Sequence, residues 1–206
     1  MHIIKNYLTK PILVMLFLGF ASGIPLALIL STVKAFLVDR NIDIVTIGFF
    51  ALVTLPYSIK FLWAPLIDSI KIPFLHKLGK RRSWIILTQI ILIILIATLG
   101  LFSDTNDISN IVLIALLISI TSASHDIAVD AYRIESIKIE NQAIAASMYI
   151  YGYRVGMLIS GAFALILSDQ FSWNIVYYFV SLAMFAGIIT TLIANEEPKK
   201  ETKEEF

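Results

Sequence analysis

The sequence predicts an all-α, polytopic membrane protein with six transmembrane helices, and three observations support this fold class. First, 58% of the 206 residues are hydrophobic and only 15% are charged, whereas a globular domain normally carries about a quarter charged residues. Second, apolar stretches of the roughly 20 residues needed to cross a bilayer recur along nearly the whole chain. Third, the segments between these stretches are mostly short and polar. Lipid is therefore expected to surround most side chains.

The predicted spans follow one another from near the N-terminus. Lys5 and Lys10 precede the first apolar run in the manner of a secretory signal. This run far exceeds the usual signal length of about 7–15 residues, so we interpret it as a retained span. Pro25, Pro56 and Pro65 are expected to kink the first two spans. The six spans are predicted at about residues 11–38, 45–67, 83–102, 109–131, 143–167 and 174–194.

The distribution of basic residues predicts the orientation of the chain. Lys and Arg concentrate in the segments that face the cytoplasm. Twelve of them fall on the side that holds both chain ends, and Arg40 stands alone on the opposite side. We therefore expect residues 1–10 and the disordered tail 196–206 to be cytoplasmic. The twelve are Lys5, Lys10, Lys71, Lys77, Lys80, Arg81, Arg82, Arg133, Lys138, Lys199, Lys200 and Lys203.

The stretch "SASHDIAVDAYR" (122–133) places two carboxylates on the fourth span. The spacing puts Ser122, Asp126, Asp130 and Arg133 on one helical face. Asp130 and Arg133 are compatible with a solvated helix end, but Asp126 lies about 10 Å deeper. Intramembrane carboxylates that face a bundle interior commonly serve proton relays or substrate sites. The alternative for Asp126 is a buried ion pair with Lys60 or with Arg154.

Three further polar residues fall within the predicted spans. Arg154 lies about 18 Å into the fifth span, near the midplane, where it is expected to face a cavity or to pair with an aspartate. Lys60 lies nearer the inner end of its span and can extend toward the interface. His125 can titrate near neutral pH, although a hydrogen-bonded packing role is favoured. No metal site is predicted, because His2 and His76 lie in cytoplasmic segments.

Small residues form stripes on two of the spans. Gly19 and Gly23 are spaced by four on the first span, and Gly152 and Gly156 are spaced by four on the fifth. Such stripes let helices approach closely in lipid. These glycines are therefore predicted to pack helices against each other.

An intramembrane enzyme is the competing class. An aspartate dyad requires carboxylates from two helices, but Asp126 and Asp130 share one. The chain contains no cysteine, which excludes a thiolate nucleophile and disulfides. We therefore predict no catalytic residue and no cofactor. The net charge of +1 gives no indication of a nucleic-acid partner.

Several blocks of sequence resemble the AmpG muropeptide permease family of the major facilitator superfamily. The blocks are "LGFASGIPLAL" (18–28), "TIGFFALV" (46–53), "KFLWAPLID" (60–68), "GKRRSWIILTQ" (79–89), "SASHDIAVDAY" (122–132) and "YGYRVGMLISG" (151–161). Eukaryotic acetyl-CoA transporters share a similar "QDIAVD" element. His125 departs from the pattern, because the family usually has glutamine there. Residues 68–82 also resemble the loop that gates facilitator transporters.

The resemblance implies proton-driven import of anhydro-muropeptides, or a related solute, across the bacterial inner membrane. It implies that Asp126, Asp130, Lys60 and Arg154 lie in or beside a central cavity. It further implies that Lys80, Arg81 and Arg82 engage acids at the cytoplasmic helix ends, beside Asp68, as a gate. The alternatives are an acetyl-CoA-type solute transporter and a non-transporting remnant or assembly partner of a related permease.

The resemblance also implies partners. Facilitator transporters bind their solute between two six-helix halves, and the six spans predicted here correspond to the N-terminal half. A second half or a second copy is therefore expected as a partner, beside membrane lipid, the solute and the proton.

Overall fold

The computed structural model describes residues 9–195, apart from 74, 76, 77 and 106. The expectations for residues 1–8, for His76 and Lys77, and for the tail 196–206 lie outside this range. Within it, all regular secondary structure is helical, and there is no β-strand. Six helical stretches are long and apolar enough to cross a membrane, which confirms the predicted fold class. They are Lys10–Asp39, Ile44–Leu62, Lys80–Phe102, Ile108–Ser136, Ile139–Ser168 and Trp173–Ile193.

The first and fifth spans have the same build. The first consists of α2 (Lys10–Ala27), the π-helical turn η1 (Leu28–Thr32) and α3 (Val33–Asp39). The fifth consists of η5 (Ile139–Asn141), α9 (Gln142–Leu158), the π-helical turn η6 (Ile159–Phe163) and α10 (Ala164–Ser168). The two π-helical turns contact each other. There the Thr32 hydroxyl donates to the Ser160 carbonyl, which joins the two irregular segments.

The second span is the most interrupted. It comprises α4 (Ile44–Phe49), the 3₁₀ turn η2 (Phe50–Thr54), α5 (Leu55–Ile59), the 3₁₀ turn η3 (Lys60–Leu62) and α6 (Ala64–Ser69). Pro56 and Pro65 each stand in the first turn of a new segment, where the missing N–H of proline costs no hydrogen bond. At the start of α4, the Asp43 carboxylate accepts from the Thr46 amide and hydroxyl, which lowers the Asp43 pKa.

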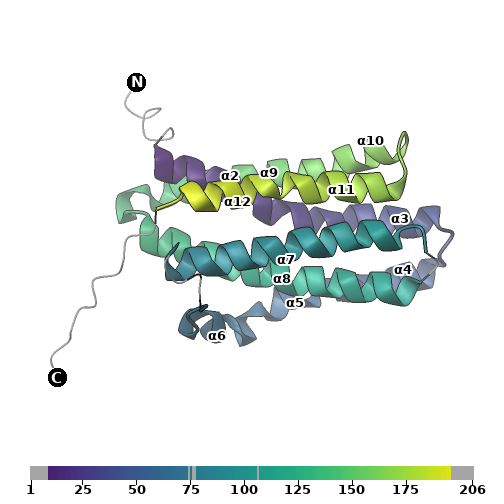
Figure 1. Ribbon diagram of the computed structural model, residues 1–206, viewed down its shortest axis with the longest axis horizontal. Helices are drawn as coiled ribbons and strands as arrows, with labels where there is room; N and C mark the ends of the chain where they lie inside the picture. The colour runs from purple at the N-terminus through teal and green to yellow at the C-terminus, as the bar shows by residue number, and fades with distance from the viewer. Residues whose placement is uncertain (1–8, 74, 76–77, 106, 196–206) are drawn as a thin grey trace.

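The third and fourth spans are long, uninterrupted helices. They are α7 (Lys80–Phe102) and α8 (Ile108–Ser136), which lie side by side (Figure 1). The sixth span consists of α11 (Trp173–Ala183) and α12 (Phe185–Ile193). α7 begins three residues before the apolar stretch, and α8 continues five residues beyond it, because a helix can extend past the hydrocarbon. Lys80, Arg81 and Arg82 lie on the extension of α7, and Arg133 and Glu135 lie on that of α8.

Two buried clusters hold the bundle together. The larger lies toward α3 and the start of α11, and includes Phe36, Leu92, Ile118 and Tyr177. The smaller lies toward the end where the described chain begins and ends, and includes Met15, Ile85, Val129 and Tyr132. Packing in the two clusters fixes the positions of the helices that carry Asp126 and its polar neighbours.

Candidate functional site

Asp126 lies on α8 inside the bundle. It is 7% exposed, and its Oδ2 atom lies 3.9 Å from Nζ of Lys60 on η3. The hydroxyls of Ser22 on α2 and Tyr149 on α9 are neighbours of the carboxylate. Groups from the first, second, fourth and fifth spans therefore converge on one carboxylate.

Several polar atoms around Asp126 have no hydrogen-bond partner within the described chain. They include Oδ1 of Asp126 and the hydroxyls of Ser22, Ser122 and Tyr57, and all are buried. Ser122 stands one helical turn before Asp126, and Tyr57 is close to both. Leaving such an atom unpaired costs about 1–3 kcal/mol. These unpaired atoms can form hydrogen bonds with water or with a polar solute in the interior of the bundle.

Asp130 and Arg133 form a pair at the end of α8. Arg133 Nη2 donates to Asp130 Oδ1 over 3.2 Å, three residues along the same helix. The side chains are 24% and 47% exposed, for Arg133 and Asp130 respectively. This pair extends the polar face of Asp126 toward the helix end.

Arg154 takes a different position from the other predicted site residues. It is exposed on α9, next to Tyr153, whose ring lies 6.0 Å from that of Tyr149. The cation that pairs with Asp126 is Lys60, not Arg154. Of the two ion pairs that the sequence allowed for Asp126, the structure forms the one with Lys60.

His125 faces α7, on a different side of α8 from Asp126. It is 1% exposed, and its Nε2 lies 3.4 Å from the amide nitrogen of Gln89 on α7. The Gln89 amide oxygen accepts from the Thr191 hydroxyl on α12 over 3.1 Å. With the amide nitrogen as donor, His125 accepts at Nε2 and carries its proton on Nδ1. The buried contact joins α7, α8 and α12 behind the site.

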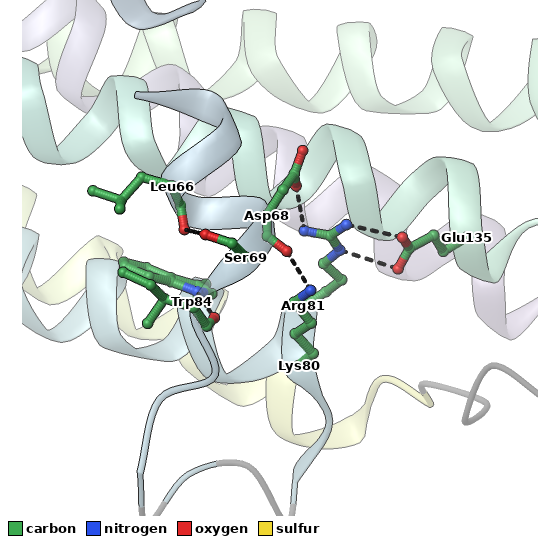
Figure 2. A network of polar contacts seen from close by, with 8 residues as sticks. Leu66, Asp68, Ser69, Lys80, Arg81, Trp84 and Glu135 are labelled. Atoms are coloured by element: carbon green, nitrogen blue, oxygen red, sulfur yellow. Dashed lines mark hydrogen bonds and ion pairs between the residues drawn. The ribbon is translucent and has the colours of Figure 1, made fainter. Parts of the chain in front are cut away.

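Lys80 and Arg81, at the start of α7, form a network of polar contacts with Asp68 and Glu135 (Figure 2). Arg81 donates from Nη1 to Asp68 over 2.6 Å. It also grips both carboxylate oxygens of Glu135 on α8, over 2.9 and 3.0 Å. Lys80 donates to the backbone carbonyl of Asp68. Arg81 thus ties α6, α7 and α8 together at a point where its side chain is only 8% exposed.

Arg82, which was grouped with its neighbours in the predicted gate, turns toward another helix. It donates to the carbonyls of Thr191 and Leu192, both over 2.9 Å. These carbonyls belong to the last turn of α12, where backbone oxygens lack partners within the helix. Arg82 therefore caps α12 as well as standing beside the Arg81 network.

Sequence reasoning missed several residues of these sites. Glu135 was not singled out, although an acid in the last turn of the fourth helix is a visible signal for pairing with the basic run. Gln89 and Ser22 gave no signal, because single polar residues in apolar helices are common. Trp63 was also missed; its Nε1 donates to Ser124 on α8 over 3.1 Å and anchors the broken second span beside Lys60.

Six long apolar helices and a buried aspartate paired with a lysine define a multi-pass membrane protein with a polar interior. The family model for acetyl-coenzyme A transporter 1 matches residues 11–192. The chain belongs to this family, and its relatives include an anhydromuropeptide permease and transporters named AmpG.

Three relatives are representative. The anhydromuropeptide permease of Escherichia coli is 41% identical over 184 residues, which cover 89% of this chain and 37% of the permease. An uncharacterized protein of Haemophilus influenzae is 39% identical, covering 93% and 44% of the two chains. The protein named AmpG 4 in Rickettsia felis is 36% identical, covering 91% and 45%. The chain thus spans less than half the length of these relatives, which are mostly named as permeases or transporters.

Proposed function

We propose that this chain forms the proton-binding half of a solute importer that carries anhydro-muropeptides or a related solute across the bacterial inner membrane. The observation that carries the proposal is the buried carboxylate of Asp126, paired with the partly exposed Lys60 and surrounded by unpaired hydroxyls from α2, α5 and α8 itself. The relatives named as permeases support transport as the activity.

The geometry suggests how a proton is coupled to movement. A proton on Asp126 neutralises the carboxylate and removes its attraction for Lys60. Lys60 sits on the 3₁₀ turn η3, between two short helices, and such turns often mark hinges. Releasing Lys60 therefore frees the second span to shift against α8. The unpaired hydroxyls of Ser22, Ser122 and Tyr57 supply hydrogen bonds to water or solute in both positions.

The ion pairs of Arg81 suggest where a gate lies, and the low burial of two spans suggests where a partner unit packs. Arg81, paired with Asp68 and Glu135, holds the end of the second span closed against α8 until those pairs break. Within an 18-residue apolar window of each span, 17% of the residues are buried in the second span and 28% in the fifth, against 72% in the first. The proposal places a second six-helix unit, from the same or another chain, against these two spans. Arg154, exposed on α9, then faces that unit or the solute between the units.

The test is uptake of labelled anhydro-muropeptide by cells that lack their own importer, with the chain expressed together with a six-helix partner unit. Asp126→Asn keeps the shape and removes the titratable group, so uptake is expected to fall to background. Asp169→Asn, at an exposed loop position, is the matched control and should leave uptake unchanged. Membrane abundance of each variant is measured in parallel.

The uptake assay distinguishes the proposed importer from the two alternatives. Unaltered uptake by Asp126→Asn removes Asp126 from the mechanism. Uptake of acetyl-CoA in place of the muropeptide would favour the second candidate, which the family model's description supports. A wild-type chain that is abundant in the membrane but moves neither solute would leave a non-transporting assembly partner as the function.

A further inference from the structure

Two hollows meet on the outer surface where α2 and α12 run side by side. One is a groove of about 490 Å³ along the two helices. The other is a smaller pocket of about 160 Å³ at the end of α8. Lys10 and Val14 line both, so the groove and the pocket are adjacent. The pair of hollows lies away from Asp126 and takes no part in the proposed transport.

The groove is apolar along its length. Leu13 and Phe17 form one wall, and Ile189 and Ile193 form the other. The one hydroxyl in the lining, that of Thr190, donates to the Ala186 carbonyl over 2.7 Å and is therefore satisfied. From Lys10 to Phe17 the groove runs about 10 Å down the helix. An acyl chain is the ligand that such a groove accepts in a membrane.

The pocket at the mouth of the groove is polar. Within the described part of the chain, Lys10 Nζ makes one long contact, 3.5 Å from Asn195 Oδ1, which leaves most of its donor capacity for a ligand. The Tyr132 hydroxyl is occupied, donating to the Asn195 carbonyl over 2.8 Å. Glu135 also lines the pocket, but Arg81 holds both of its carboxylate oxygens. Among the described residues that line the pocket, the charge that can attract a ligand is therefore the ammonium of Lys10.

We propose that the two hollows form one binding site for an anionic phospholipid. One acyl chain lies in the groove between α2 and α12, and the phosphate lies in the pocket against Lys10. A basic residue beside an apolar cleft between transmembrane helices suits this class of lipid. The bound lipid joins α2, α12 and the end of α8, and so braces the helices next to the Arg81 network.

The experiment counts lipids retained by the full chain. The protein is placed in nanodiscs of equimolar phosphatidylglycerol and phosphatidylcholine, released, and weighed by native mass spectrometry. One phosphatidylglycerol is expected to remain bound in preference to phosphatidylcholine. Lys10→Gln should reduce that preference about fivefold, since one lysine near an anionic headgroup contributes about 1 kcal/mol. Lys34→Gln, which removes a cation from α3 toward the other end of the bundle, is the matched control.

Variants of the groove separate the acyl chain from the headgroup. Ala186→Leu and Thr190→Phe each fill the groove and should abolish retention of both lipids while leaving helix content unchanged. Two variants are used so that one that fails to fold does not decide the result. Equal retention of the two lipids by the wild type overturns the proposal, and so does an equal loss of preference in the Lys10 and Lys34 variants. Transport activity is not part of the readout, so a failure of the proposed function leaves this test standing.

Discussion

At the residue scale, the contact between α2 and α9 depends on four glycines. A Cβ on Gly19 or Gly23 would collide with the backbone of Tyr149 or Tyr153. A Cβ on Gly152 or Gly156 would collide with the backbone of Leu16 or Phe20. Since the obstructing atoms are backbone, neither helix can give way by turning a side chain. The two helices approach as closely as they do because no side chain stands between them.

We therefore expect Gly152→Ala to destabilise the protein by about 1–3 kcal/mol, the usual cost of overpacking. Gly48→Ala is the matched control, because Gly48 lies in α4 with nothing within 4 Å of its Cβ position. That change should be neutral or slightly stabilising, since alanine favours a helix over glycine. The measurement is the unfolding midpoint in a detergent titration followed by helix content. Equal midpoints for the two variants would contradict the close-packing argument.

Arg81 provides the second residue-scale prediction. Arg81→Gln leaves the Glu135 carboxylate without its two donors, so the free energy of unfolding should fall by about 3 kcal/mol. Lys80→Gln removes a neighbouring charge that contacts only the Asp68 backbone among the contacts described above, and should cost less than about 1 kcal/mol. The same detergent titration measures both. Similar losses of unfolding free energy for the two variants would show that the positive charge alone matters, and not the contact of Arg81 with both carboxylate oxygens of Glu135.

At the element scale, helices in lipid need specific contacts, because apolar burial gives no net drive for them to associate. The buried contact of Gln89 with His125 and Thr191 serves this purpose for α7, α8 and α12. It also fixes the rotation of α8 about its axis. Because His125 and Asp126 are adjacent on that helix, holding one against α7 directs the other toward Lys60.

Gln89→Leu is expected to destabilise the bundle by about 1–3 kcal/mol, because buried His125 then loses its partner. His125→Leu in the same chain removes the stranded polar group and should recover part of the loss. Gln170→Leu, the same exchange at an exposed loop position, is the control. Thermal unfolding midpoints compare the variants. Strictly additive losses in the double variant would mean that Gln89 and His125 are not coupled.

At the scale of the whole molecule, burial is distributed unevenly among the spans. Compared over an 18-residue apolar window of each span, the first span is the most buried, at 72% of residues, and the second is the least, at 17%. The first therefore acts as the centre of the bundle, and the second lies on its surface, consistent with a span that moves. The second span is also the one broken by prolines and 3₁₀ turns.

Orientation is the prediction at this scale. The chain contains no cysteine, so a single introduced cysteine reports its own side of the membrane. Thr105→Cys should react with an impermeant maleimide added outside intact cells, and Lys71→Cys should react only after the membrane is opened. Both positions are exposed. The reverse pattern would contradict the orientation that the positive-inside rule predicts.

The sequence by itself determined the number of membrane-crossing helices. It also indicated that Asp126 lies well inside the fourth span. Both follow from local composition and from the fixed rise of 1.5 Å per residue along a helix. The basic run at Lys80–Arg82 and the two glycine pairs were visible for the same reason, since each is a pattern within one segment.

Only the tertiary structure decided which groups meet. In the structure, Asp126 pairs with Lys60, and Arg154 is exposed. Glu135 forms an ion pair with Arg81, and Gln89 contacts His125. These contacts join residues on different helices, and they depend on how each helix is rotated and how closely it approaches its neighbours. Composition and periodicity within one helix carry little information about that rotation, because in lipid it is set by contacts between helices.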